Sequence, residues 1–202
     1  MLPLLVNVAN KKVLVVGYGK VGQRKAQQFR DQGASIWVYD EVYWAGTSTE
    51  AGKGSAADAN AEEDTSKVYN FGFDPLSVES LRDFSFVLIA TSDGNYNQKV
   101  KDHCQDQGIW CNRADAPEEN DFHTMATLWR GELGVSVSTQ GTVPGFTKNL
   151  KDYIDHLLPP DTQSFLESLK QARKMAIELE EPEKTAQLAL ITDRIQEWLR
   201  GL

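Results

Sequence analysis

The sequence predicts an α/β protein whose first half forms a doubly wound parallel sheet. Residues 13–17 read Val-Leu-Val-Val-Gly, a short apolar run that is typical of a strand buried on both faces. This run leads into the glycine-rich segment 17–22 and a helical segment, and residues 35–39 form a second apolar run. The two runs and the helix between them make a βαβ unit of about 30 residues. Further alternation of strand and helix patterns extends this unit into a larger sheet.

Strands and helices are predicted to alternate as far as residue 112. The strands are expected at residues 13–17, 35–39, 67–70, 84–90 and 109–112, and the helices at 23–32, near 76–82 and at 95–107. Residues 45–66 contain no Val, Ile, Leu, Met or aromatic side chain, so this segment cannot bury enough apolar surface to offset its ordering entropy. We expect it to be a mobile surface excursion rather than a domain boundary.

The pattern changes beyond residue 121. Residues 122–129 and 133–139 flank Arg130-Gly131-Glu132, and the second of these runs alternates valine with serine, which predicts a hairpin. A helix is expected from Pro144 to Leu158, because proline is favoured in a first turn and two further prolines follow. Two amphipathic helices complete the chain, with apolar stripes whose spacing is typical of packing against a core or a partner.

The charge balance argues against a nucleic-acid-binding protein. The chain has 202 residues, with 21 Lys and Arg against 29 Asp and Glu, for a net charge of −8. Proteins that bind phosphate backbones normally carry a basic excess. An anionic small ligand remains compatible with this balance, because a local cluster of basic side chains sets the field of a pocket.

The remaining composition favours a soluble cytoplasmic protein without a metal centre. The two cysteines form no CxxC pair and no disulfide framework, which is typical of a reducing compartment. The N-terminal segment lacks the basic and apolar regions of a signal peptide, and no stretch approaches the ~20 apolar residues that cross a bilayer. The three histidines are far apart in the sequence, and no HExxH motif occurs, so no metal ligands are predicted.

The glycine-rich segment carries the first functional prediction. Gly17, Gly19 and Gly22 form GxGxxG after a buried strand and before a helix, and Asp40 follows 18 residues after the third glycine. In this context the motif predicts a Rossmann-type dinucleotide site. Gly17 would permit the tight turn, Gly19 would let the backbone approach a pyrophosphate, and Gly22 would let helix and strand pack closely. The intervening residues of this cofactor turn are Tyr18, Lys20 and Val21.

Asp40 predicts the choice of cofactor. Its carboxylate would accept hydrogen bonds from the ribose hydroxyls and repel a 2′-phosphate, which favours NAD over NADP. The alternative is a Rossmann-like sheet that binds no cofactor.

A polar turn after the predicted strand 84–90 is the second candidate for cofactor binding. It includes Thr91, Ser92, Asp93 and Asn97, which lie where open α/β sheets bind ligands. Ser92 or Asp93 could equally form the N-cap of the following helix, and the sequence alone does not decide between these roles.

Several segments in unbroken order resemble one family. They are 2–6 (Leu-Pro-Leu-Leu-Val), 13–26, 89–97, 111–117 (Cys-Asn-Arg-Ala-Asp-Ala-Pro), Asp121-Phe122, 130–133 and 137–144. Together they resemble the precorrin-2 dehydrogenase / sirohydrochlorin ferrochelatase module of the siroheme synthase family. The main departures from the family pattern are Met125 in place of a proline, Gln140 in place of a glycine, and the segment 45–66.

This resemblance implies a fold and a reaction. Members of the family oxidise precorrin-2 to sirohydrochlorin with NAD⁺, and some then insert Fe²⁺ to give siroheme. The implied organisation is an NAD-binding Rossmann domain at 1–113, a dimerisation and active-site region at 114–145 and a C-terminal helical domain at 146–202, in a homodimer. Whether this chain inserts iron is left open by the sequence.

The resemblance also implies catalytic residues. The family's key aspartate falls on Asp115, at the carboxyl edge of the sheet, where it would serve as a base or an electrostatic partner. The plainer interpretation of Asp115 is a turn-forming residue in Asp-Ala-Pro. His123 lies near it in sequence and is a weaker candidate, because a lone histidine more often packs or hydrogen-bonds.

Substrate contacts are expected from basic and hydroxyl side chains, because precorrin-2 carries many carboxylates. The candidates are Arg113, Ser138, Thr139, Gly141, Thr142 and Lys148. The basic side chains could equally be ordinary solvated charges, and the polar turn could serve only as the entry to the Pro144 helix.

Two rival functions remain compatible with the motif. A regulatory module that senses NAD through an oligomer interface would need the glycine turn and Asp40 but neither Asp115 nor the polar turn at 138–144. A Rossmann scaffold that binds proteins through its C-terminal helices would bind no NAD at all.

Overall fold

The computed structural model describes residues 2–40, 43 and 67–202. It divides into two compact units, residues 1–123 and 124–202. The segment 45–66, predicted to be mobile, lies outside the described residues. Residues 114–123 group with the first unit, whereas the sequence expectation placed them with the hairpin.

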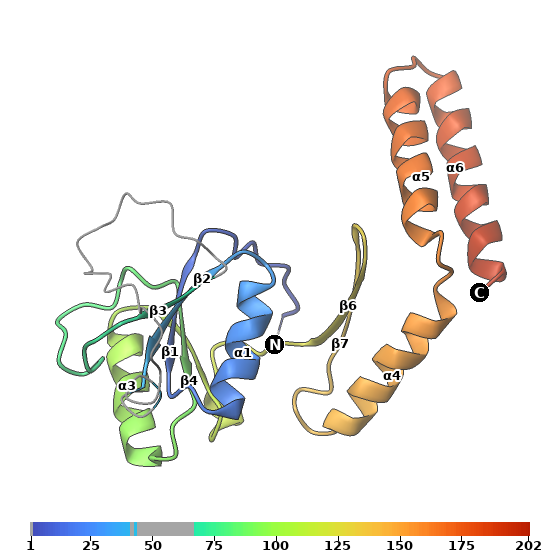
Figure 1. Ribbon diagram of the computed structural model, residues 1–202. Helices are drawn as coiled ribbons and strands as arrows, with labels where there is room; N and C mark the ends of the chain where they lie inside the picture. Colours follow the sequence, from blue (N-terminus) through green and yellow to red (C-terminus); the bar gives the residue numbers. More distant parts are fainter. Residues whose placement is uncertain (1, 41–42, 44–66) are drawn as a thin grey trace. The chain divides into compact units, whose positions relative to one another are not determined.

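The first unit is built on a five-stranded sheet in which every pair of neighbouring strands is parallel (Figure 1). The strands are β1 (Lys12–Val16), β2 (Ser35–Tyr39), β3 (Val68–Asn70), β4 (Phe86–Ile89) and β5 (Trp110–Arg113), in the spatial order β3-β2-β1-β4-β5. The order reverses between β1 and β4, which is the switch point of a Rossmann sheet. The predicted α/β fold is confirmed.

Two helices cover opposite faces of this sheet, α1 (Lys20–Arg30) and α3 (Gly94–Asp106), as Figure 1 shows. Each face has its own apolar core. Leu14 and Val16 of β1 belong to the cluster that includes Val100 of α3, and Val13 and Val15 belong to the cluster that includes Phe29 of α1. Residues 13–16 are fully buried, which explains why β1 is a continuous apolar run rather than an alternating one.

The helix predicted near residues 76–82 is wrong. These residues form turns and bends. The Asp74 carboxylate accepts a hydrogen bond from the backbone N–H of Leu76 at 2.9 Å, and the Ser77 hydroxyl donates to the carbonyl of Asp74 at 2.7 Å. These bonds, with one from the backbone N–H of Ser77 to the carbonyl of Asp74 at 2.8 Å, close a single turn that does not continue as a helix.

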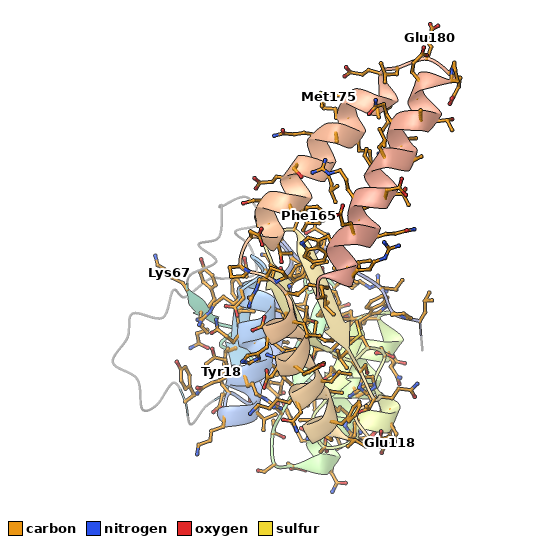
Figure 2. All side chains as sticks on the ribbon, turned by 90° about the vertical axis from the view of Figure 1, so that its right-hand side faces the viewer. Tyr18, Lys67, Glu118, Phe165, Met175 and Glu180 are labelled. Atoms are coloured by element: carbon orange, nitrogen blue, oxygen red, sulfur yellow. The ribbon has the colours of Figure 1, made fainter. Side chains whose placement is uncertain are left out.

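The second unit contains a hairpin and three helices, as predicted. Strands β6 (Ala126–Arg130) and β7 (Leu133–Val137) pair in antiparallel fashion, and the helices are α4 (Pro144–Leu157), α5 (Thr162–Ile177) and α6 (Glu183–Arg200). The rings of Phe165 and Trp198 stack at 5.1 Å between α5 and α6. In Figure 2, Phe165 lies toward one end of this helical pair and Glu180 at the other.

Among the described residues, none of the helices combines the length and the apolar character that crossing a membrane requires.

Two glycines of the β1–α1 turn give a paired test of the fold. A Cβ atom at Gly22 would lie 2.1 Å from the carbonyl oxygen of Gly17, whereas a Cβ at Gly19 would meet nothing within 4 Å. We expect Gly22→Ala to lower the free energy of unfolding by about 1–3 kcal/mol or more, because the backbone must shift. Gly19→Ala should change it by less than about 1 kcal/mol. Urea unfolding followed by circular dichroism measures both, and equal midpoints for the two variants would contradict the packing described.

Candidate dinucleotide site at the sheet edge

The β1–α1 turn lies directly against the end of β4. Gly17 has a φ of +88°, and a Cβ there would lie 2.8 Å from the carbonyl group of Ala90 and the backbone nitrogen of Thr91. Only a residue without a side chain fits this contact and this backbone conformation. The turn is therefore held at the switch point between β1 and β4, where Rossmann sheets bind dinucleotides.

The N-terminus of α1 is open to a ligand. Gly19 is its N-cap residue, no side chain caps the helix, and no acidic side chain lies in the first turn. The first backbone N–H groups of a helix have no partner within the helix, and the helix dipole favours an anion there. Lys20 and Val21 are exposed beside this opening, and Tyr18 is buried. These features fit a diphosphate group.

Asp40 joins the end of β2 to the glycine turn. Its Oδ2 accepts a hydrogen bond from the backbone N–H of Tyr18 at 2.6 Å, and its Oδ1 accepts one from Tyr43 at 2.9 Å. A carboxylate has about four acceptor positions, so it retains capacity for ribose hydroxyls. The sequence suggested the ribose contact but not this second role in shaping the turn.

The polar turn after β4 is organised by its own side chains. Asp93 is the N-cap of α3, and its Oδ1 accepts hydrogen bonds from the backbone N–H groups of Asn95 and Tyr96, each at 3.0 Å. Asn97 is fully buried and bonds with Thr91 through both ends of its amide. The capping role therefore falls to Asp93, while Ser92 is exposed.

Asp115 meets Arg113 through two hydrogen bonds. Arg113 Nε donates to Asp115 Oδ1 at 3.1 Å, and one terminal nitrogen donates to Oδ2 at 2.9 Å. The pKa of Asp115 is lowered to about 2, chiefly by the hydrogen bonds from Arg113 and also by Asn97, against the opposing effect of partial burial. The Arg113 pKa is raised, chiefly by the hydrogen bond to Asp115. Asp115 is therefore a carboxylate throughout the neutral pH range.

The guanidinium of Arg113 is engaged inside the unit. Its side chain is only 7% exposed, and it also contacts Gln98 of α3 and Glu119 of the short 3₁₀ helix η1 (Pro117–Glu119). The sequence predicted that Arg113 binds substrate, whereas in the structure its guanidinium binds the carboxylates of Asp115 and Glu119. Glu119 is held in turn by Lys101 at 3.2 Å. Sequence reasoning missed these partners, because nothing in the sequence signals a pairing between α3 and a turn 18 residues away.

The structure does not join His123 to Asp115. Its neighbour Phe122 packs with the α1-side core, whereas Arg113 bonds to Gln98 on the α3 side. The Nε2 atom of His123 is buried and has no hydrogen-bond partner among the described residues. Sequence reasoning also missed Lys25 of α1. Its ammonium group donates a hydrogen bond to the Asn112 side chain, and burial lowers the pKa of Lys25.

The predicted substrate-binding hydroxyls belong to the second unit and build the turn before α4. Ser138 Oγ accepts from the backbone N–H of Gln140 at 3.0 Å, Thr139 Oγ1 accepts from that of Val143 at 3.1 Å, and Thr142 donates to the Thr139 carbonyl at 2.6 Å. Gly141 has a φ of +82°. Lys148 is exposed on α4. These hydroxyls form the helix entry that the sequence offered as the alternative role.

Within the described part of the chain, no three or more His, Cys, Asp or Glu side chains gather in a way that could hold a metal ion.

Comparison with known proteins assigns the family. A family model described as "Putative NAD(P)-binding" matches residues 4–126, which is more than half of the chain. The chain belongs to this NAD(P)-binding family. The predicted resemblance to siroheme synthases is also confirmed. The NAD(P)-binding chain is 30% identical over 198 residues to the siroheme synthase of Enterobacter sp. (strain 638), covering 98% of this chain and 38% of that protein.

Other matches agree. The siroheme synthase of Salmonella typhimurium is 29% identical over 159 residues, covering 78% of this chain and 32% of its own length. This NAD(P)-binding chain thus spans less than half the length of the siroheme synthases that it matches. A solved structure named "SirC, precorrin-2 dehydrogenase" has the same fold, with a TM-score of 0.62 and 21% identity, covering 96% of this chain and 88% of that one.

The Arg113–Asp115 pair predicts a dependence of stability on acid. The Asp115 pKa falls from its ordinary value of 3.8 to about 2 on folding, so the pair stabilises the fold fully above pH ~4 and loses this effect as the pH falls toward 2. We expect Arg113→Met to cost about 1–3 kcal/mol at pH 7, and the difference from the wild type should shrink below pH 4. Urea unfolding at several pH values measures it.

The control is Arg130→Met, which breaks an ion pair with Asp155 whose side chains are 40% and 37% exposed. This variant should cost less than about 1 kcal/mol. A cost of Arg113→Met that is the same at pH 7 and at pH 2.5 would contradict the linkage to Asp115.

Proposed function

We propose that the protein is an NAD-dependent dehydrogenase that oxidises precorrin-2 to sirohydrochlorin. The single observation that carries the proposal is the open N-terminus of α1 at the β1–β4 switch point, with the Asp115 carboxylate beside the adjacent β4–α3 turn. The names of the related proteins supply the substrate: siroheme synthase and precorrin-2 dehydrogenase. Because the chain spans only part of the siroheme synthases, the reaction is inferred for the segment that they share with it.

Different residues of the first unit would bind the cofactor and act on the substrate. Bound NAD⁺ supplies a nicotinamide ring that accepts a hydride. The backbone N–H groups after Gly19 would bind its diphosphate, and Asp40 would accept hydrogen bonds from its adenosine ribose. Asp115 would face the macrocycle as a fixed carboxylate and favour the positive charge that develops there when the hydride leaves. The proton that completes the oxidation goes to water.

Substrate contacts from the second unit remain part of the proposal. Lys148 and the polar turn with Ser138, Thr139, Gly141 and Thr142 are exposed or half-buried, so their polar groups could reach substrate carboxylates. His123 is retained only as a weak catalytic candidate, since no hydrogen bond links it to Asp115.

Iron insertion, which the resemblance also allows, has no specific support in the described residues. The carboxylate that would collect the pyrrole protons is already paired with Arg113. The proposal therefore does not include iron insertion. Incubation of the protein with sirohydrochlorin and Fe²⁺ as a co-substrate would test that activity separately.

Cofactor choice is the first test. We expect NAD⁺ to bind at least ~10-fold more tightly than NADP⁺, because the Asp40 carboxylate would repel the 2′-phosphate. Asp40→Asn should narrow the difference, since it removes the charge but keeps an acceptor oxygen for the Tyr18 N–H group. Isothermal titration of both nucleotides measures this. Equal affinities for the wild type would remove Asp40 from the cofactor site, and no binding of either would favour the scaffold alternative.

Turnover is the second test. Anaerobic incubation with precorrin-2 and NAD⁺ should yield sirohydrochlorin, followed optically. Asp115→Asn should lower kcat by ~10²–10³-fold with unchanged NAD⁺ affinity, because the fixed charge acts on the reacting macrocycle. The matched control is Asp106→Asn, an exposed carboxylate at the end of α3. Wild-type turnover by Asp115→Asn would make Asp115 a turn residue, and NAD⁺ binding without any product would favour the sensor alternative.

Exposed apolar side chains of the second unit support a homodimer. No residue of α4 or α6 is buried, and the apolar side chains of Trp129, Val143, Phe146 and Tyr153 are between 42% and 62% exposed. So much uncovered apolar surface is typical of an interface, and we propose that a second copy covers it through the region 114–145 and α4.

Sedimentation at micromolar concentration should therefore give twice the mass of the chain. Phe146→Asp should dissociate the dimer, because it places a charge in the apolar surface of α4. Leu190→Asp, on the exposed side of α6, should leave the dimer intact. A monomeric wild type, or a dimer unaffected by Phe146→Asp, would contradict this interface.

A further inference from the structure

Arg113 and Asp115 are exposed to different extents. The Arg113 side chain is 7% exposed and that of Asp115 is 33% exposed, although two hydrogen bonds join them. The guanidinium therefore lies inside the unit, while part of the carboxylate reaches the surface. A ligand at this edge of the sheet can approach Asp115 but not Arg113.

Side chains from α3 and from η1 also bind the Arg113 guanidinium. Gln98 of α3 accepts a hydrogen bond from it, and Glu119 Oε2 lies 3.3 Å from one of its terminal nitrogens. Lys101 of α3, only 6% exposed, binds both the carboxylate and the backbone carbonyl of Glu119. The two cations, Arg113 and Lys101, and the two carboxylates, Asp115 and Glu119, cancel in formal charge. The Arg113 guanidinium is already engaged by Asp115, Glu119 and Gln98 and is not available to bind a substrate.

Asp115 is held against the first turn of α3. A Cβ atom at Gly94 would lie 3.5 Å from Asp115 Oδ2, so the absence of a side chain at Gly94 leaves this face of the carboxylate uncovered. The segment that leads into α3 begins at Thr91, whose backbone nitrogen would lie 2.8 Å from a Cβ atom at Gly17. Asp115 therefore lies against the start of α3, which follows the segment that contacts the dinucleotide loop.

We propose that Arg113 is a positioning residue, which fixes Asp115 as a permanent carboxylate for hydrogen bonding to the substrate and excludes it as the proton acceptor. This inference rests on the proposed function and names the role of one pair within it. The low pKa of Asp115 agrees, because a carboxylate whose conjugate acid has a pKa of about 2 is a weak base at pH 7 and holds an abstracted proton poorly.

The reaction balances without protonating Asp115. Precorrin-2 and NAD⁺ give sirohydrochlorin, NADH and one proton. One C–H bond of the macrocycle breaks with its electron pair, which passes to the nicotinamide, and a second hydrogen leaves as a proton to water. Asp115 accepts a hydrogen bond from the macrocycle in both states and returns unchanged.

A double-mutant cycle on kcat at pH 7 tests the positioning role. Arg113→Met should lower kcat at least ~10-fold with unchanged NAD⁺ affinity, and Arg113→Lys should recover part of the loss, because it restores the charge but not the paired geometry. In an Asp115→Asn background, Arg113→Met should cost little more, since Arg113 acts only through Asp115. The control is Lys99→Met, an exposed cation of α3.

Two results would overturn the proposal. One is wild-type kcat in Arg113→Met. The other is a loss of kcat on Arg113→Met that is as large in the Asp115→Asn background as in the wild type, which is the result of a general structural role.

A second readout does not depend on turnover. In protein labelled with ¹³C at aspartate carboxyl groups, the Asp115 signal, assigned with Asp115→Asn, should not move between pH 6 and 4 in the wild type and should begin to titrate in Arg113→Met. Equal titration in the two proteins would contradict the positioning role. If precorrin-2 is not oxidised at all, the proposed function fails, and this titration alone decides the role of Arg113.

Discussion

The carbonyl oxygen of Gly17 and the backbone of α1 at Gly22 approach so closely that a Cβ between them would be 2.1 Å from the oxygen. The rest of the first unit depends on this approach. It brings α1 down onto β1, and the left-handed conformation of Gly17 then directs the chain against Ala90 and Thr91 at the end of β4. The start of the helix and the ends of two central strands thereby meet at one edge of the sheet, with an uncapped helix N-terminus facing outward. The steric room that the glycines leave is the position at which we propose that the cofactor's diphosphate binds.

The polar residues around this edge are arranged by the sheet. Adjacent residues of β5 point to opposite faces, so Asn112 binds Lys25 of α1 while Arg113 binds Gln98 of α3. Asn120 continues the edge of β5, because its side-chain amide bonds to both the N–H and the carbonyl group of Arg113. The loop after β5 is therefore held by these bonds. Asp115 is positioned by Arg113 of β5 rather than by its own turn alone.

Much of the fold was predictable because buried parallel strands leave a strong pattern, and the glycine spacing with Asp40 points to a cofactor. What the sequence could not predict depends on contacts between distant residues. Arg113 reads as a surface cation, and its inward position follows only from the carboxylates of Asp115 and Glu119 on both sides of it. Instead of the predicted helix near 76–82, the chain forms turns and bends, and the Asp74 carboxylate accepts a hydrogen bond from the N–H group of Leu76. The hydroxyls at 138–142 suit both a ligand and a helix entry, and the sequence offered no basis for choosing.

The central claim is that NAD⁺ binds on the first turn of α1, beside the β4–α3 turn. The most direct measurement is a titration of ¹⁵N-labelled protein with NAD⁺, followed by the backbone amide signals. Binding as described should shift the amides of residues 18–22 and 91–94 most strongly and leave those of α5 and α6 unchanged. Shifts concentrated elsewhere, or no shifts at millimolar NAD⁺, would contradict it.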